Sequence, residues 1–165
     1  MKIQQISLFA ENKPGRIAAP VRLLAQEGIN IRALYLADTQ QYGILRMIVS
    51  NCGEVTRLLE SHGFVVKVTE VLAVEVADRP GGLANVLGAL EGSGINIEYM
   101  YAFPYVRGDR AILIFRFADP DAAIACLQTA GINLLADREL LEKCSCSTRG
   151  EGGLARTHET PGLDR

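Results

Sequence analysis

The sequence contains one pattern twice, and this repeat limits the folds that the chain can adopt. The first copy opens with Asn-Lys-Pro-Gly at residues 12–15 and reaches Gly-Ile-Asn-Ile at 28–31. The second opens with Asp-Arg-Pro-Gly at 78–81 and reaches Gly-Ile-Asn-Ile at 94–97, so every matched position lies 66 residues further along. Eight of the twenty positions in these two stretches are identical. Two copies are too few for a solenoid, and they predict two small domains.

Hydrophobic periodicity gives both copies the same order of secondary structure. Apolar residues that alternate predict strands, and apolar residues three and four apart predict amphipathic helices. The order in each copy is strand, helix, strand, strand, helix, strand. It predicts an α+β fold of two ferredoxin-like βαββαβ units, each with an antiparallel four-stranded sheet and both helices on one face.

The predicted domain limits follow from the joint between the copies. The fourth strand of the first copy runs into the second copy without a linker, near Glu70. We therefore expect one unit at residues 1–70 and a second at residues 71–143. Units of about 65 residues are marginally stable alone, so the copies should pack on each other or on a second chain. Few aliphatic side chains occur in residues 144–165, and we expect a disordered tail there.

The Pro-Gly corner between the first strand and the first helix is the most faithfully repeated segment. Asn12 and Asp78 are expected to hydrogen-bond backbone donors at the helix start, and Pro14 and Pro80 to lie in the first helical turn. Backbone N–H groups at a helix start attract carboxylates and other anions. The corner is therefore a candidate site, although a capped helix start without a ligand would use the same residues. The glycines that leave its backbone open are Gly15, Gly81 and Gly82.

Two residues depart from the regular pattern of the helices. Pro20 lies inside the first predicted helix, where the second has Val86, and it should kink or weaken that helix. His62 shares a helix face with Leu58 and Leu59, which predicts a half-buried histidine rather than a catalytic one.

The asparagine of each Gly-Ile-Asn-Ile segment is a second candidate for binding. Asn30 and Asn96 fall at the start of the second strand, which is an edge strand in this topology. An amide offers both a donor and an acceptor, which suits a ligand that carries an ammonium and a carboxylate. A turn residue that tolerates an unusual backbone angle would explain the asparagine equally well.

Composition excludes several classes of function. The net charge is −2 and the pI is near 5.7, which argues against general nucleic-acid binding. The N-terminus lacks the apolar block and cleavage site of a signal peptide, so we expect a cytoplasmic protein. No catalytic motif occurs, and the four cysteines and two histidines are not spaced like metal ligands. We therefore expect no metal and no cofactor; the cysteines are Cys52, Cys126, Cys144 and Cys146.

Together, Asn/Asp-x-Pro-Gly, an apolar helix and Gly-Ile-Asn-Ile resemble the ACT domain, a small-molecule regulatory module of amino-acid metabolism. Both copies match, over about residues 3–136. The chain is similar to stand-alone tandem ACT proteins, and Glu-Asn-Lys-Pro-Gly at 11–15 also resembles the ACT part of the acetolactate synthase regulatory subunit. The latter resemblance is partial, because that subunit has one ACT unit and a different C-terminal domain.

The resemblance implies that an amino acid binds at an interface between ACT units. The corner of one unit would face the second strand of its partner unit. In the second copy Gly82 replaces Arg16 and would open space for the ligand, so that the second corner is the better candidate. The implied ligand contacts are Asn12, Gly15, Arg16, Ile17, Asn30 and Ile31 in the first copy, and Asp78, Gly81, Gly82, Leu83, Asn96 and Ile97 in the second.

Three functions are compatible with these observations. The first is a non-catalytic amino-acid sensor that regulates amino-acid metabolism as a homo-oligomer, most simply a homodimer. The second is a regulatory subunit of a separately encoded metabolic enzyme, such as acetolactate synthase. The third is an enzyme, because ferredoxin-like folds also host catalysis. The absence of a catalytic constellation favours the first.

Overall fold

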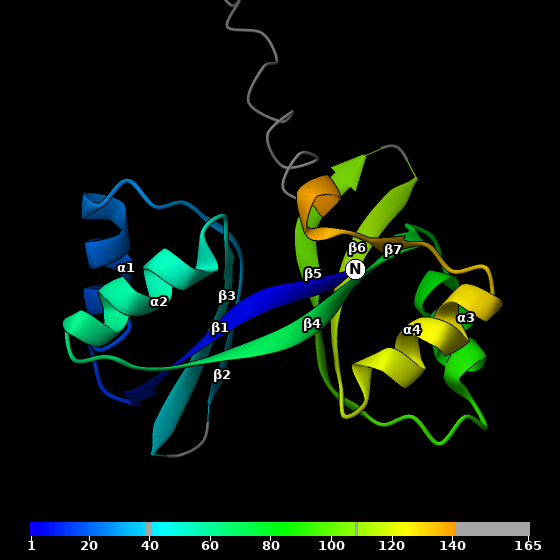
Figure 1. Cartoon of the computed structure of the whole chain (residues 1–165), viewed down its shortest axis with the longest axis horizontal. Coiled ribbons are helices and arrows are strands. Elements are labelled where there is room, and N and C mark those ends of the chain that lie inside the picture. Colours follow the sequence, from blue (N-terminus) through cyan, green and yellow to red (C-terminus); the bar gives the residue numbers. More distant parts are fainter. Residues whose placement is uncertain (39–40, 108, 141–165) are drawn as a thin grey trace, which may run out of the picture.

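The computed structural model describes residues 1–38, 41–107 and 109–140, and its elements follow the predicted order in both copies (Figure 1). The strands are β1 (Lys2–Glu11), β2 (Ile31–Asp38), β3 (Tyr42–Val49), β4 (Val65–Ala77), β5 (Ile97–Arg107), β6 (Arg110–Phe117) and β7 (Leu134–Leu135). The helices are α1 (Ala18–Gln26), α2 (Cys52–Ser61), α3 (Gly82–Leu90) and α4 (Pro120–Thr129). Residues 137–140 are also helical; the expected tail at 144–165 lies outside the described residues.

The strands form one sheet in the order β2-β3-β1-β4-β6-β5, and β7 pairs with β4 beside this path. All pairings are antiparallel, which confirms the predicted α+β class. The 13-residue β4 serves both copies, because β1 pairs with its residues 65–72, β6 with residues 72–77 and β7 with residues 73–74. The two predicted sheets are therefore joined through a shared strand. The boundary at residue 70 falls inside β4 and stays a prediction.

The helices cover the outer faces of this sheet. α1 and α2 lie against one half and α3 and α4 against the other, on opposite flanks of the molecule (Figure 1). Each helix pair closes a separate apolar core, with Leu24 and Leu59 in the first and Val86 and Leu127 in the second. Helices on one face of each half are what the sequence predicts.

The helix-free faces of the two halves pack on each other and form a third core. Its members come from both copies and include Ile48 and Ile114. The ring of Tyr35 on edge strand β2 stacks on the ring of Tyr101 on the opposite edge strand β5, with ring centroids 5.6 Å apart. Tyr101 follows Tyr35 by 66 residues, so the repeat packs on itself around this pair.

A buried polar network lies within this third core. Gln5 is fully buried, and its amide nitrogen donates to the hydroxyl oxygen of Tyr99 at 2.7 Å. The hydroxyl of Tyr101 donates to the Gln5 carbonyl oxygen at 2.9 Å. Burial raises the pKa of the Tyr101 phenol. Because Gln5 belongs to the first copy and both tyrosines to the second, the network ties the copies together.

The helix starts differ from the prediction. α1 begins at Ala18, which places Pro20 in its first turn, where its missing N–H has no intrahelical acceptor. Pro20 thus delays the helix by two residues relative to α3 and does not kink its interior. Pro14 and Pro80 lie in the turns before the helices rather than in their first turns.

Glycines with a positive φ follow the helices α1, α2 and α4. Gly28, Gly63 and Gly131 each follow the C-cap residue with a positive φ of 67°, 80° and 71°. α3 ends at Leu90, so Gly94, at the position of Gly28, lies in the loop beyond it. His62 is exposed at the end of α2, which corrects the half-buried prediction, and its Nδ1 lies 2.9 Å from the Leu58 carbonyl oxygen.

Candidate functional site

The two Pro-Gly corners have the same backbone geometry. Gly15 and Gly81 both adopt a left-handed conformation, with φ of 82° and 93°. The carbonyl of each glycine accepts a hydrogen bond from the residue four positions later, Ala19 at 3.3 Å and Asn85 at 2.9 Å. A Cβ at either glycine would meet no atom within 4 Å, so both corners are open to solvent. The two copies therefore share the backbone conformation of the corner as well as its residues.

Each corner is also tied to the tip of a neighbouring hairpin. The Asn12 N–H donates to the carbonyl of Gln41 between β2 and β3 at 3.0 Å. The Asp78 N–H donates to the carbonyl of Asp109 between β5 and β6 at 2.6 Å. In the described part of the chain, no side-chain hydrogen bond of Asn12 or Asp78 reaches the start of α1 or α3, whose N-cap residues are Ile17 and Gly81, so the predicted capping is wrong. Backbone turns take over that role.

Gly82 has a structural explanation that the sequence did not reveal. It is buried, and an added Cβ would lie 2.0 Å from the carbonyl oxygen of Ala77. The absence of its side chain makes room for the chain itself. Our expectation that Gly82 opens space for a ligand is therefore not supported by the local geometry, and the open position of the second corner is Gly81.

Charges gather at the first corner. The Glu11 carboxylate lies 3.1 Å from Lys13 Nζ and 3.1 Å from Arg16 Nη2, and all three side chains are exposed. The Lys13 ammonium and, to a smaller extent, the Arg16 guanidinium hold the pKa of Glu11 below its usual range. A ligand carboxylate that approached Arg16 would compete with Glu11.

The predicted contacts of one copy do not meet within that copy. Glu11 pairs with Tyr42 at one end of β3, whereas Ile31 pairs with Val49 at the other end. The corner and the asparagine are thus separated by seven residues of strand, or about 23 Å. The second copy has the same separation along β6. In the described part of the chain, no hydrogen bond joins either corner to Asn30 or Asn96.

Four of the other predicted ligand contacts also pack in the apolar cores. Ile17 and Ile31 pack against the core of the first copy, and Leu83 and Ile97 against that of the second. Asn30 and Asn96 are exposed immediately before the edge strands β2 and β5, as predicted.

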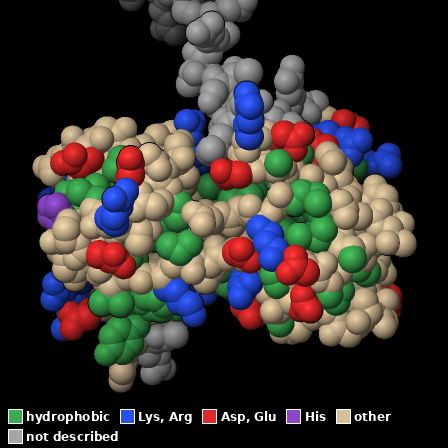
Figure 2. Space-filling model, in the orientation of Figure 1, with side chains coloured by type: hydrophobic (Ala, Val, Ile, Leu, Met, Phe, Trp, Pro, Cys, Tyr) green, Lys and Arg blue, Asp and Glu red, His purple; other side chains and the backbone are tan. Residues whose placement is uncertain are grey.

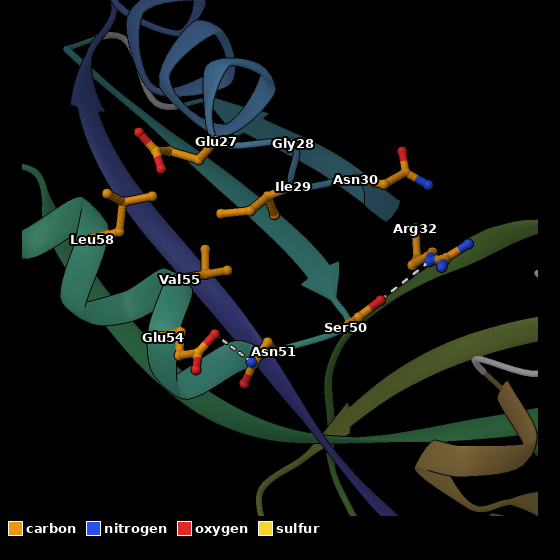
Figure 3. A pocket seen from close by; sticks show the side chains of 10 residues that line it. All are labelled: Glu27, Gly28, Ile29, Asn30, Arg32, Ser50, Asn51, Glu54, Val55 and Leu58. Carbon is orange, nitrogen blue, oxygen red and sulfur yellow. Dashed lines mark hydrogen bonds between the residues drawn. The ribbon is translucent and has the colours of Figure 1, made fainter.

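A cavity lies beside each asparagine. The cavity beside Asn30 has a volume of about 470 Å³ and lies between the end of α1 and the start of α2 (Figure 3). The cavity beside Asn96 has about 600 Å³ and lies against α3, with the apolar Leu87, Ile95 and Ile97 in its lining. Sequence reasoning found the asparagines but missed the other side chains of the first cavity. The signal for Arg32, Ser50 and Glu54 was a difference between the copies, because Glu98, Ala118 and Ala122 stand at their positions.

The described part of the chain contains neither a cluster of metal-binding side chains nor a membrane-spanning helix. Between residues 1 and 140, apart from the gaps at 39–40 and 108, no three His, Cys, Asp or Glu side chains gather as metal ligands. In the same part of the chain, no helix is long and apolar enough to cross a membrane.

Comparison with known proteins gives a family and several relatives. The family model for the ACT domain pair matches residues 1–144. Protein BT0572 from Bacteroides thetaiotaomicron has 37% sequence identity and a TM-score of 0.79; the match covers 85% of this chain and 96% of that one. No curated protein matches significantly.

The regulatory subunits of aspartate kinase have a similar fold. The subunit from Thermus thermophilus has 20% identity and a TM-score of 0.56, over 77% of this chain and 91% of that one. The subunit from Thermus flavus has 18% identity and a TM-score of 0.54, over 78% and 92%.

Proposed function

The chain belongs to the family of ACT domain pairs, and from this premise we propose that it is a non-catalytic regulatory module that binds a free amino acid. The observation that carries the proposal is the pair of open corners. Two glycines, 66 residues apart, hold the same left-handed conformation and leave their backbone free of neighbouring atoms. Both glycines are exposed, so that a carboxylate could approach the backbone N–H groups beside them, which supports the proposal.

The proposed site is completed by a second unit. Because a corner and its own asparagine lie about 23 Å apart at opposite ends of a strand, one unit alone cannot bring both to one small ligand. A neighbouring unit that runs antiparallel places its corner beside the asparagine. The ligand would then stabilise whichever arrangement completes the site, which is the physical basis of regulation by such a module.

The surface offers a contact for a second copy of the chain. Leu34 and Leu36 on edge strand β2 are 57% and 49% exposed, and Tyr42 on β3 is 56% exposed. Figure 2 shows hydrophobic side chains gathered over this end of β2 and β3, at the lower left. An edge strand with an apolar face is a template for pairing with another chain. This favours a homodimer in which the β2 edges meet.

A thermal-shift screen of the twenty amino acids tests the proposal. Binding to the folded state alone raises its stability by RT ln(1 + [L]/Kd), so a millimolar ligand with micromolar affinity produces a clear shift. Gly81→Asp and Gly15→Asp should reduce the shift, because they place a negative charge where the ligand carboxylate approaches. Gly81→Asn and Gly15→Asn are matched controls, since asparagine also tolerates the left-handed conformation. Equal shifts in the aspartate and asparagine variants would argue against carboxylate binding at the corners.

A regulatory subunit of a separately encoded enzyme is the alternative, and it differs in its partner. Its regulatory role would require a large protein bound to the pair, whereas a stand-alone sensor forms homo-oligomers only. Purification from native cells under mild conditions, followed by mass spectrometry, separates the two. A stoichiometric metabolic enzyme in the complex would favour the alternative over the stand-alone sensor.

A further inference from the structure

The cavity beside Asn30 has side chains of opposite charge in its lining, which the equivalent place in the second copy lacks. Arg32 on β2 supplies a guanidinium, and Glu54 on α2 supplies a carboxylate (Figure 3). In the part of the chain that the structure describes, neither side chain forms an ion pair. Two opposite charges that border one cavity without neutralising each other are available to a ligand.

The two charged side chains form hydrogen bonds with Ser50 and Asn51, which are consecutive in the sequence. Arg32 Nε donates to the hydroxyl oxygen of Ser50 at 3.4 Å. The amide nitrogen of Asn51 donates to the carboxylate of Glu54. Figure 3 shows both pairs along the same border of the cavity. Since the Cα atoms of neighbouring residues are about 3.8 Å apart, both charges are fixed close to one opening.

The rest of the lining is apolar. Ile29 precedes β2, and Val55 and Leu58 lie on the inner side of α2; Val55 is buried and the other two are half-buried. Figure 3 shows Ile29 and Val55 pointing toward each other from the two sides. A cavity of about 470 Å³ is within the range of about 300–1,000 Å³ for small-molecule sites, which combine apolar walls with a few placed polar groups.

The total charge of the lining restricts the ligand further. Glu27 and Glu54 oppose the single guanidinium of Arg32. A purely anionic ligand, such as phosphate or a simple carboxylate, is therefore disfavoured. A ligand with both an ammonium and a carboxylate, joined to an aliphatic chain, matches the charges and the apolar walls.

The second copy has lost this set of side chains while it keeps the asparagine. Glu98 stands at the position of Arg32 and pairs with Arg116 at 3.3 Å. Ala118 and Ala122 stand at the positions of Ser50 and Glu54. Two apolar residues of the lining differ as well, since Ala123 and Cys126 stand at the positions of Val55 and Leu58. These differences indicate that the first copy carries a feature that the fold itself does not require.

We propose that this cavity is an intra-unit binding site for an aliphatic amino acid, with Arg32 and Ser50 on its carboxylate and Glu54 on its ammonium group. The site is complete in one chain and lies apart from the Pro-Gly corners. It goes beyond the proposed function, since that function uses the corners and needs a neighbouring unit. A chain with both sites would bind the amino acid twice, in different surroundings.

Isothermal titration of the full chain with L-leucine, L-isoleucine and L-valine tests the proposal. Arg32→Ala and Glu54→Gln should each weaken the binding of the preferred amino acid at least about tenfold, because each removes a charge-assisted contact. Arg22→Ala and Glu60→Ala are matched controls, since they remove the same charges from exposed positions of α1 and α2 outside the cavity. For leucine, 4-methylpentanoate and isopentylamine lack one charged group each and should bind at least tenfold more weakly. Circular dichroism verifies that each variant is folded.

The outcomes separate this site from the corners. Loss of binding in the Arg32 and Glu54 variants, with binding kept in Gly15→Asp and Gly81→Asp, supports the cavity. Unchanged stoichiometry and affinity in both cavity variants, or no heat with any of the three amino acids at 10 mM, overturns it. Binding that only the corner variants abolish also overturns it and leaves the proposed function standing.

Discussion

Replacement of Gly82 by alanine gives a sharp test of the geometry at the second corner. The added Cβ would lie 2.0 Å from the carbonyl oxygen of Ala77, about 1 Å closer than real contacts allow. α3 would have to move away, although Val86 and Leu90 anchor it in the core. Overpacking of this kind costs about 1–3 kcal/mol, and we expect the upper end because the obstructing atom is backbone. In a chain of this size, 3 kcal/mol corresponds to a Tm lower by about 6–12 °C.

Two other glycines provide controls for the same assay. Gly81→Ala meets no atom but must hold a φ of 93°, so it should cost about 1–2 kcal/mol. Gly88→Ala lies within α3 with open space around it, and it should stabilise the protein by about 0.5–1 kcal/mol. Urea unfolding followed by circular dichroism measures all three. If Gly82→Ala is no less stable than Gly81→Ala, our interpretation of Gly82 as a packing residue is wrong.

Three further predictions concern the polar groups. Gln5→Leu leaves tyrosine hydroxyls of the buried network unpaired and should lower the free energy of unfolding by about 2–3 kcal/mol. The double variant Gln5→Leu with Tyr101→Phe should be about 1 kcal/mol more stable than the summed losses of the single variants imply. Strictly additive losses would contradict the network. Because the folded state lowers the pKa of Glu11, this carboxylate stabilises the fold above its usual pKa of 4.5, and the stabilisation is lost as the pH falls through its pKa in the folded state. The free energy of unfolding of Glu11→Gln and of the unmodified chain, measured across pH 3–6, checks this. A difference between the two that does not change with pH would refute it. Because the folded state raises the pKa of Tyr101, stability should fall as the pH rises above its usual value of 10.0, and Tyr101→Phe should show a weaker fall; equal slopes would contradict the burial argument.

The order of elements was predictable because each copy repeats the same periodicity. Alternation and helical spacing are local, and each was present twice, so an error in one copy was visible against the other. The positive φ at residues 15 and 81 is likewise consistent with the sequence, because glycine adopts this conformation more readily than other residues do. The predicted role of these corners as ligand sites stays a prediction.

Features that depend on distant neighbours were not predictable. Gln5 and Ser7 are polar and alternate with the apolar Ile6 and Leu8 along β1, yet both are buried. Their burial arises because the helix-free faces of the two copies pack on each other, which neither copy reveals alone. Gly82 is a similar case, since the close carbonyl of Ala77 is a property of the folded turn.

The differences between the copies were harder to interpret than the identities. Arg32 and Glu54 attracted no attention in the sequence because their counterparts are Glu98 and Ala122. In the structure they border one cavity. The residues that both copies share thus indicated what the fold and its corners require. The polar residues that only one copy has indicated where that copy differs from the other.

A crystal structure of the full chain with its best-shifting amino acid tests the central proposal most directly. We expect electron density for the ligand where Gly15 or Gly81 of one unit faces Asn30 or Asn96 of a neighbouring unit, with the ligand carboxylate on backbone N–H groups of the corner. A dimer in which other protein atoms fill both corners, with no amino acid beside them at saturating concentration, would contradict it.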